Sequence, residues 1–166
     1  MPAFLRFDGD CLIVLRQTVL AVAPMEGCAL LIGDENIDSN FHNGTIWNLR
    51  YIWPCNNIWE PTIFRDLEQS ENTTFENEKS QTKHSRFAID PLEQIKAQKW
   101  ARERNWKILG TAHSHPEGEA TPSRLDHLLA FSPRLMVIVS GSGLVRSWWI
   151  QSSNPSQTSE ITHLNN

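Results

Sequence analysis

The run Cys28-Ala-Leu-Leu-Ile32 constrains the fold more than any other part of the sequence. It places apolar side chains at every position and is followed directly by Gly33. A strand that is apolar on both faces has to be covered on both faces, as the strands of α/β proteins are. We therefore expect this run to be a buried strand.

Further strands are predicted from short apolar or β-branched segments. Residues 135–140 and 144–151 flank Gly141-Ser-Gly143, which is a hairpin signal. Residues 34–43 are polar and are predicted to form a turn. The remaining predicted strands are residues 11–15, 45–53 and 107–113.

Helical patterns alternate with these strands. A first helix, ended by Pro24, is predicted from residues at helical spacing, namely Leu15, Thr18, Val19 and Val22. Two more helices begin with an N-cap residue followed by proline, at Asp90-Pro91 and at Thr121-Pro122. They are predicted to end near residues 104 and 131. The alternation predicts an α/β fold with helices packed on one mixed sheet.

Two polar segments are predicted to lie outside the packed core. Residues 66–86 are almost wholly polar, which is typical of a loop or flexible insertion. This loop either has no role or acts as a flap over a substrate. The polar tail, residues 152–166, is predicted to fray. The predicted organisation is one domain over residues 1–151 followed by this tail.

Charge and composition exclude several classes of protein. The net charge of −4 over 166 residues argues against a nucleic-acid or anionic-membrane binder. No apolar run is long enough to span a bilayer and the first residues do not resemble a signal peptide, so we expect a cytoplasmic protein. Cys11, Cys28 and Cys55 form no CxxC pair and are predicted to be buried hydrophobic residues.

The chemistry is concentrated in residues 112–127. His113 and His115 are two residues apart at the end of a predicted strand, so their side chains share a face. Ser123 and Asp126 are three apart in a predicted helix and also share a face. Two imidazoles and a carboxylate with one position left for water are typical of catalytic zinc. A structural role for the histidines remains the alternative.

A zinc site that activates water for hydrolysis also needs a base that takes a proton from that water. Glu117 and Glu119 lie on a glycine-containing loop, whereas Glu26 directly precedes the buried strand. Burial of a carboxylate raises its pKa towards neutrality, where a general base works best. Glu26 is therefore the preferred candidate. His127 would point about 100° away from Asp126 and is not counted as a ligand, and His42, His84 and His163 are predicted to be surface residues.

The spacing of these residues resembles the JAMM motif of the catalytic MPN domains, the Mov34/Pad1 family. The carriers of the resemblance are His113-Ser-His-Pro116, Ser123 with Asp126, and the segment Pro24-Met-Glu-Gly-Cys-Ala-Leu-Leu-Ile-Gly33. The resemblance covers roughly residues 12–150 and implies an α/β MPN fold, related in shape to the cytidine deaminases. It implies zinc ligands His113, His115 and Asp126, a general acid/base Glu26, and a Ser123 that stabilises the oxyanion.

The resemblance implies a zinc metalloprotease or isopeptidase of deubiquitinase-like type. Its expected substrate is the C-terminal tail of a ubiquitin-like protein or of a β-grasp sulfur carrier. The main rival is a non-cleaving MPN scaffold that binds such a partner. A zinc nucleoside deaminase is disfavoured, because it needs a His-x-Glu pair and a PCxxC pair that the sequence lacks.

The substrate tail is expected to add to a sheet edge. The sequence has seven tryptophans, and most are predicted to pack in the core, with one or two lining a groove as the alternative. Those considered are Trp47, Trp53, Trp59, Trp148 and Trp149. Edge strands and tryptophans are also compatible with a homodimer.

Overall fold

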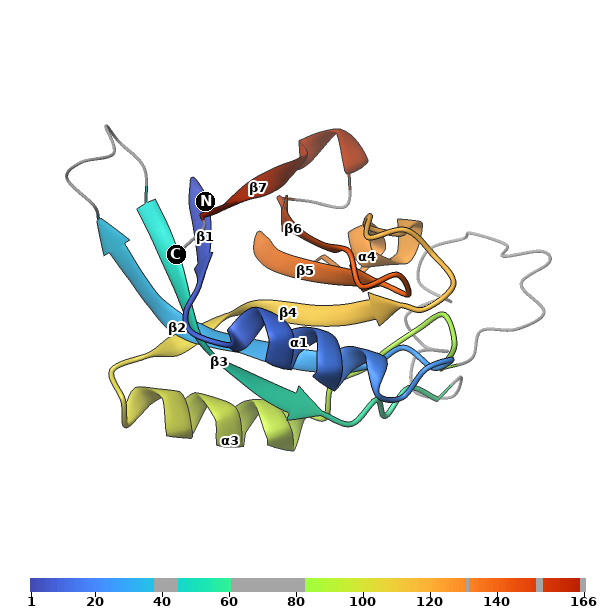
Figure 1. Ribbon diagram of the computed structural model, residues 1–166, viewed down its shortest axis with the longest axis horizontal. Coiled ribbons are helices and arrows are strands. Elements are labelled where there is room, and N and C mark those ends of the chain that lie inside the picture. Colours follow the sequence, from blue (N-terminus) through green and yellow to red (C-terminus); the bar gives the residue numbers. More distant parts are fainter. Residues whose placement is uncertain (38–44, 61–82, 131, 152–153, 165–166) are drawn as a thin grey trace.

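One sheet that closes on itself organises the molecule (Figure 1). The computed structural model describes residues 1–37, 45–60, 83–130, 132–151 and 154–164. The strand order is β1-β3-β2-β4-β5-β6-β7, and β1 pairs with β7 to complete the circuit. The strands are β1 Phe4–Phe7, β2 Cys28–Ile37, β3 Thr45–Cys55, β4 Lys107–His115, β5 Arg134–Ser140, β6 Val145–Ile150 and β7 Thr158–Leu164.

The predicted buried strand is confirmed as the first half of β2. It pairs antiparallel with both β3 and β4, and the side chains of Leu31 and Ile32 are fully buried. β4 pairs in parallel with β5, while β5 and β6 form the predicted antiparallel hairpin. The sheet is therefore mixed, as the sequence predicts.

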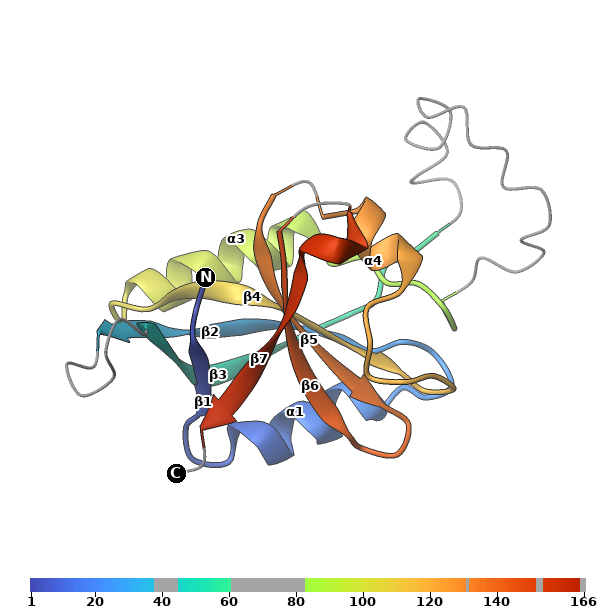
Figure 2. The same cartoon turned by 90° about the horizontal axis from the view of Figure 1, so that it is seen from above.

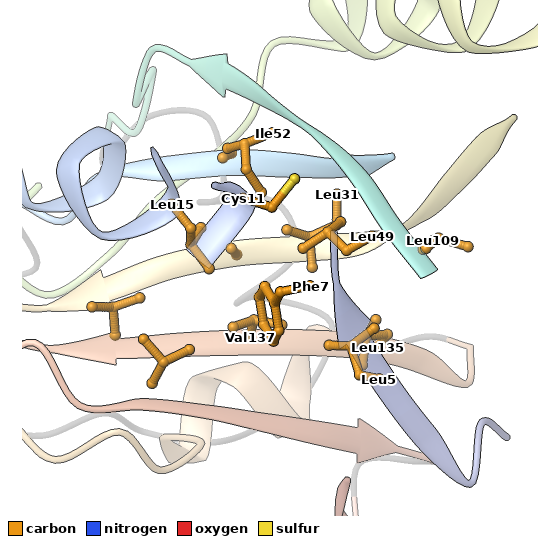
Figure 3. Packing of buried hydrophobic residues seen from close by; sticks show 14 of the residues in the cluster. Leu5, Phe7, Cys11, Leu15, Leu31, Leu49, Ile52, Leu109, Leu135 and Val137 are labelled. Atoms are coloured by element: carbon orange, nitrogen blue, oxygen red, sulfur yellow. The ribbon is translucent and has the colours of Figure 1, made fainter. Parts of the chain in front are cut away.

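Helices cover opposite faces of the central strands (Figure 2). α1, Cys11–Leu20, buries Cys11, Leu15 and Val19 in the largest hydrophobic cluster, which the strands curve around (Figure 3). α3, Pro91–Arg102, packs Ala97 and Ala101 on the other face of β2. Each fully buried leucine or valine side chain contributes about 1.5–3 kcal/mol relative to an exposed one.

Local signals explain where the helices begin. The Asp90 side chain accepts a hydrogen bond from the Leu92 backbone N–H, and Pro91 occupies the first helical position of α3. α4, Arg124–Leu128, is a short helix that lies beyond β4 in the chain.

Among the described residues, no helix is long and apolar enough to cross a membrane.

Four local predictions are wrong. Residues 11–15 begin α1 instead of forming a strand, because their apolar side chains continue at the helical spacing of Val19. β2 continues through residues 34–37, which were expected in a turn, because β3 pairs with them. The last helix begins after Ser123 instead of Thr121 and ends at Leu128.

The fourth correction concerns the C-terminal tail. Instead of fraying, it forms β7, which pairs with β1 and β6 and buries Ile161 in the core. Most of the residues around Ile161 are polar. The segment therefore resembles a frayed tail in sequence, and only its pairing with distant strands makes it a strand. Of the predicted polar loop at 66–86, residues 66–82 lie outside the described residues.

Candidate metal centre

The end of β4 brings two imidazoles together. His113 is held between Cys28 of β2 and Ile138 of β5, and its side chain is fully buried. His115 lies two residues further on the same face, beyond the last pair with β2. The Nε2 atoms of His113 and His115 are 2.9 Å apart. The predicted histidine pair therefore converges on one point.

Asp126 reaches the same point from the first turn of α4. Ser123 is the N-cap residue of this helix: its Oγ accepts from the Asp126 backbone N–H at 3.2 Å, and its own N–H donates to Asp126 Oδ2 at 2.7 Å. This capping box fixes the carboxylate. Asp126 Oδ1 lies 3.4 Å from His113 Nε2, and Oδ2 lies 3.7 Å from His115 Nε2.

These three side chains could hold a metal ion, since their ligand atoms all lie within 4.8 Å of one another. His115 Nδ1 is 2.9 Å from the Glu119 carbonyl oxygen, which requires the proton on Nδ1 and leaves the Nε2 lone pair free. Two nitrogen donors and one carboxylate suit zinc better than calcium or magnesium, which prefer oxygen ligands. The donor set therefore fits a zinc ion.

The electrostatics of Asp126 and His115 favour a bound cation. Burial acts to lower the pKa of His113, but Asp126 and Glu26 outweigh it and raise that pKa. Burial acts to raise the pKa of Asp126, but His113 and the Ser123 hydrogen bonds outweigh it and hold the pKa well below its ordinary value. Burial and the neighbouring His113 lower the pKa of His115. A charged carboxylate beside a neutral imidazole is the state in which both bind metal.

Glu26 stands next to this group in the same enclosed space. Its side chain is buried, and its Oε1 atom lies 4.0 Å from His115 Nε2. Burial raises the pKa of Glu26 to about 7, with Asp126 adding to the rise and His113 opposing it. The carboxylate can therefore gain and lose a proton near neutral pH. Glu117 and Glu119, the other candidates for the base, are exposed.

The strand residue between the histidines positions the Glu26 segment from the opposite face. Ser114 Oγ accepts from the Gly27 N–H at 2.9 Å and donates to the Val19 carbonyl of the α1 segment at 2.9 Å. A Cβ atom at position 27 would overlap the Val19 carbonyl, so only glycine fits there. Sequence reasoning did not identify Ser114, although its position between the histidines indicates that it points to the other face of β4.

Asn57 is a second residue that sequence reasoning missed. Its Nδ2 atom donates to the Glu26 carbonyl at 2.9 Å and to the Arg86 carbonyl at 2.8 Å, and its Oδ1 accepts from the Ala88 N–H at 3.2 Å. Glu26 N–H in turn donates to the Lys83 carbonyl at 2.7 Å. Asn57 therefore ties the Glu26 turn to the chain that leads into α3. No local pattern in the sequence indicates this role.

A cavity of about 200 Å³ opens beside these groups. Glu26, His115, Ser123 and Asp126 line it together with the segment before α3. On that segment, the Phe87 ring stacks on the His113 ring with centroids 4.4 Å apart. This aromatic contact fixes the plane of the His113 imidazole and so helps to orient its Nε2 atom.

Ser123 contacts Asp126, the carboxylate of the candidate metal group. Its Oγ donates to Asp126 Oδ2 at 2.7 Å, so the residue orients the third ligand. Its predicted role at the oxyanion stays a prediction. His127 is buried and has its Nδ1 atom 3.3 Å from Thr158 Oγ1, away from the ligand group.

The predictions for the other histidines and the cysteines are confirmed only in part. His84 is exposed as predicted, but His163 is partly buried, with its Nε2 atom 2.7 Å from Ser147 Oγ. His42 lies outside the described residues. Cys11 and Cys28 are buried as predicted, whereas Cys55 is only partly buried.

The tryptophans pack mainly against one another and the sheet. Trp53 and Trp100 meet edge-on at 5.7 Å, as do Trp47 and Trp149. Trp59 is almost fully buried. Core packing therefore explains most of the aromatic content, as predicted.

Fold and site together define a JAB/MPN-type domain with a His-His-Asp group close enough to bind a metal. The sequence matches the family described as prokaryotic homologs of the JAB domain over residues 10–151, and the chain belongs to this family.

Solved structures support the fold. A protein from Desulfitobacterium hafniense superposes with a TM-score of 0.70 at 23% identity, covering 96% of this chain and 91% of that one. A protein from Salinibacter ruber gives 0.56 at 21%, with 96% and 92% covered. A JAB1/MPN domain protein from Archaeoglobus fulgidus gives 0.52 at 14%, with 98% of each chain covered. No curated protein sequence matches the chain significantly.

Proposed function

We propose that this protein is a zinc-dependent metallopeptidase or isopeptidase. The observation that carries the proposal is the position of Glu26. A buried carboxylate whose pKa is raised to about 7 lies 4.0 Å from a ligand imidazole, in the same cavity as the His-His-Asp group. Titratable groups with perturbed pKa values in a cavity are typical of catalytic sites. A purely structural metal site would not need this carboxylate.

His113, His115 and Asp126 hold the zinc ion in this proposal. When bound, zinc lowers the pKa of water to about 7 and polarises a carbonyl group. Glu26 takes the proton from the attacking water and returns it to the leaving amine, which its pKa near neutrality permits in both directions. Ser123 keeps Asp126 in place through the capping box and lines the cavity wall, where rotation of its hydroxyl away from Asp126 Oδ2 would let it donate to the oxyanion.

The proposed substrate is an extended C-terminal tail, of a ubiquitin-like protein or a β-grasp sulfur carrier. The support is the family resemblance together with the shape of the sheet. β1 pairs with β3 only as far as Leu49, so among the described strands none pairs with residues 50–55 on the side away from β2. An extended peptide can add to such a free stretch of strand. This stretch leads to Asn57, which holds the Glu26 turn.

The test is a cleavage assay with the zinc-loaded protein. The substrates are a β-grasp protein with a peptide-linked C-terminal extension and the same protein joined through an isopeptide bond to a lysine side chain. We expect cleavage of at least one of the two, inhibition by a zinc chelator, and recovery when zinc is added back. Glu26→Gln should retain zinc and lose about 10²- to 10⁴-fold in rate, the usual contribution of a general acid/base.

A matched control is Glu117→Gln, which makes the same change at an exposed position on the adjacent loop. It should cleave at the parent rate. Full turnover by Glu26→Gln would refute the assignment of the base. Binding of the β-grasp protein without cleavage of either linkage would instead support a non-cleaving scaffold.

A further inference from the structure

The metal-site cavity continues along β4, away from the histidines. A second hollow of about 250 Å³ lies further down the strand, lined by Ile108, Trp47 and Trp149 among others. Three residues line both spaces, namely Gln94, Thr111 and Arg134. The two hollows therefore meet at one polar position between α3 and β5.

Arg134 is the charged group at this junction. It is the first residue of β5 and its side chain is half-buried. Its Nε atom makes only a long hydrogen bond of 3.4 Å to the Ser132 carbonyl, and no carboxylate of the described residues lies within ion-pair distance. Burial lowers the pKa of Arg134, and no carboxylate in the described part of the chain offsets this effect. A guanidinium group that is partly desolvated and has no counter-ion is well suited to bind an anionic ligand.

Thr111 supplies a second unsatisfied group. It lies on the same face of β4 as His113 and His115, and it is paired across the sheet with Met136, another residue lining the cavity. Its Oγ1 atom is buried and has no hydrogen-bond partner among the described residues. An enclosed hydroxyl without a partner is costly, and rotation of this side chain towards the cavity that Thr111 lines would let a bound polar group or a water satisfy it.

The distance from the metal group suits two to four residues of an extended substrate. Thr111 precedes His113 and His115 by two and four residues, which corresponds to about 7 and 13 Å along a strand. A peptide bound with its reacting carbonyl at the histidines would place a group two to four residues away at this junction. Arg86, the other arginine in the cavity wall, has its guanidinium 5.3 Å from the Trp59 ring centre instead.

We infer that Arg134, with Thr111 and Gln94, forms a subsite for a carboxylate of the peptide substrate. The carboxylate accepts hydrogen bonds from the Arg134 guanidinium, and Gln94 of α3 lines both hollows beside it. The inference deepens the proposed peptidase function and rests on it for the identity of the ligand as a substrate. Two sources supply the same chemistry, an acidic side chain or a free C-terminus.

The test measures binding, so that it does not depend on cleavage. Zinc-loaded Glu26→Gln protein is titrated with acetyl-Gly-Asp-Gly-amide, its Asn analogue, and acetyl-Gly-Gly-Gly with a free carboxylate, while amide and Arg Nε–H signals are followed by NMR. We expect one carboxylate peptide to bind at least tenfold more tightly than the Asn peptide and to shift the Arg134 and Thr111 signals. Arg134→Met should lose about 10- to 100-fold in that affinity, the value of one charge-assisted hydrogen bond.

Two controls separate the subsite from general charge and from misfolding. Arg102→Met removes an exposed arginine of α3 and should leave the preference unchanged. Thr111→Val keeps the shape of the side chain and should reduce the preference for the carboxylate peptide over the Asn peptide. Its unfolding temperature should equal that of the parent, which excludes misfolding as the cause. Equal binding of all three peptides, or an unchanged preference in Arg134→Met, would overturn the subsite. If the preference holds while no linkage is ever cleaved, the subsite stands and the peptidase proposal fails.

Discussion

Replacement of Glu26 by glutamine should make the metal-free protein more stable, and more so at high pH. In the folded chain, burial raises the pKa of Glu26 from 4.5 to about 7. Between these two values the native state binds more protons than the unfolded state. Stability therefore falls as the pH rises through this window, because ionisation of the buried carboxylate is suppressed only in the folded chain. Glutamine keeps the shape of the side chain and does not ionise.

The magnitude follows from the size of the shift. One pKa unit corresponds to about 1.4 kcal/mol, so a rise of roughly 2.5 units costs the parent about 3 kcal/mol at pH 8. At pH 5, where Glu26 is protonated in the native state, the cost falls to about 1 kcal/mol. The advantage of the glutamine variant should thus grow by about 2 kcal/mol between pH 5 and pH 8.

Urea denaturation of chelator-treated protein at both pH values measures this difference. Other titrating groups, including His113 and Asp126, are present in parent and variant alike, so they cancel to first order when the variant is compared with the parent at each pH. Glu117→Gln, which makes the same change at an exposed position, serves as the matched control. An advantage of Glu26→Gln that is the same at pH 5 and pH 8 would refute the elevated pKa, and with it the reason for choosing Glu26 as the base.

Three further substitutions test the parts that support the site. Ser123→Ala removes the N-cap of α4 and should cost about 1 kcal/mol in urea denaturation and weaken zinc binding about tenfold or more, in competition with a chelator. Leu31→Ala opens the fully buried centre of the core and should cost about 2–5 kcal/mol by the same denaturation assay. Asn57→Ala leaves two carbonyls and two N–H groups without its amide and should cost about 1–3 kcal/mol. The Asn57 change should also lower turnover while zinc content, measured by elemental analysis, stays at the parent value.

The ligand group could be predicted from sequence because each member depends on local periodicity. Two strand positions of the same parity direct His113 and His115 to one face, and the Ser123–Asp126 spacing is that of a capping box. Only their meeting in space required the fold. Glu26 was identified because it directly precedes a run that could only be a buried strand.

Other features depend on partners far away in the chain. β1 has only four residues, and most side chains of β7 are polar. Neither segment therefore shows a clear strand pattern in the sequence. They become strands because they pair with each other and with β3 and β6. Asn57 and Arg134 likewise act through contacts with segments remote in sequence, which local spacing does not reveal.

Metal analysis of a ligand variant tests the central assignment most directly. Parent protein, His115→Ala and His84→Ala are loaded with zinc, dialysed identically and measured by elemental analysis. One zinc per chain is expected in the parent and in His84→Ala, which changes an exposed histidine outside the ligand group, and far less in His115→Ala. A parent that retains no zinc, or a His115→Ala variant that retains as much as the parent, would contradict a zinc site formed by His113, His115 and Asp126.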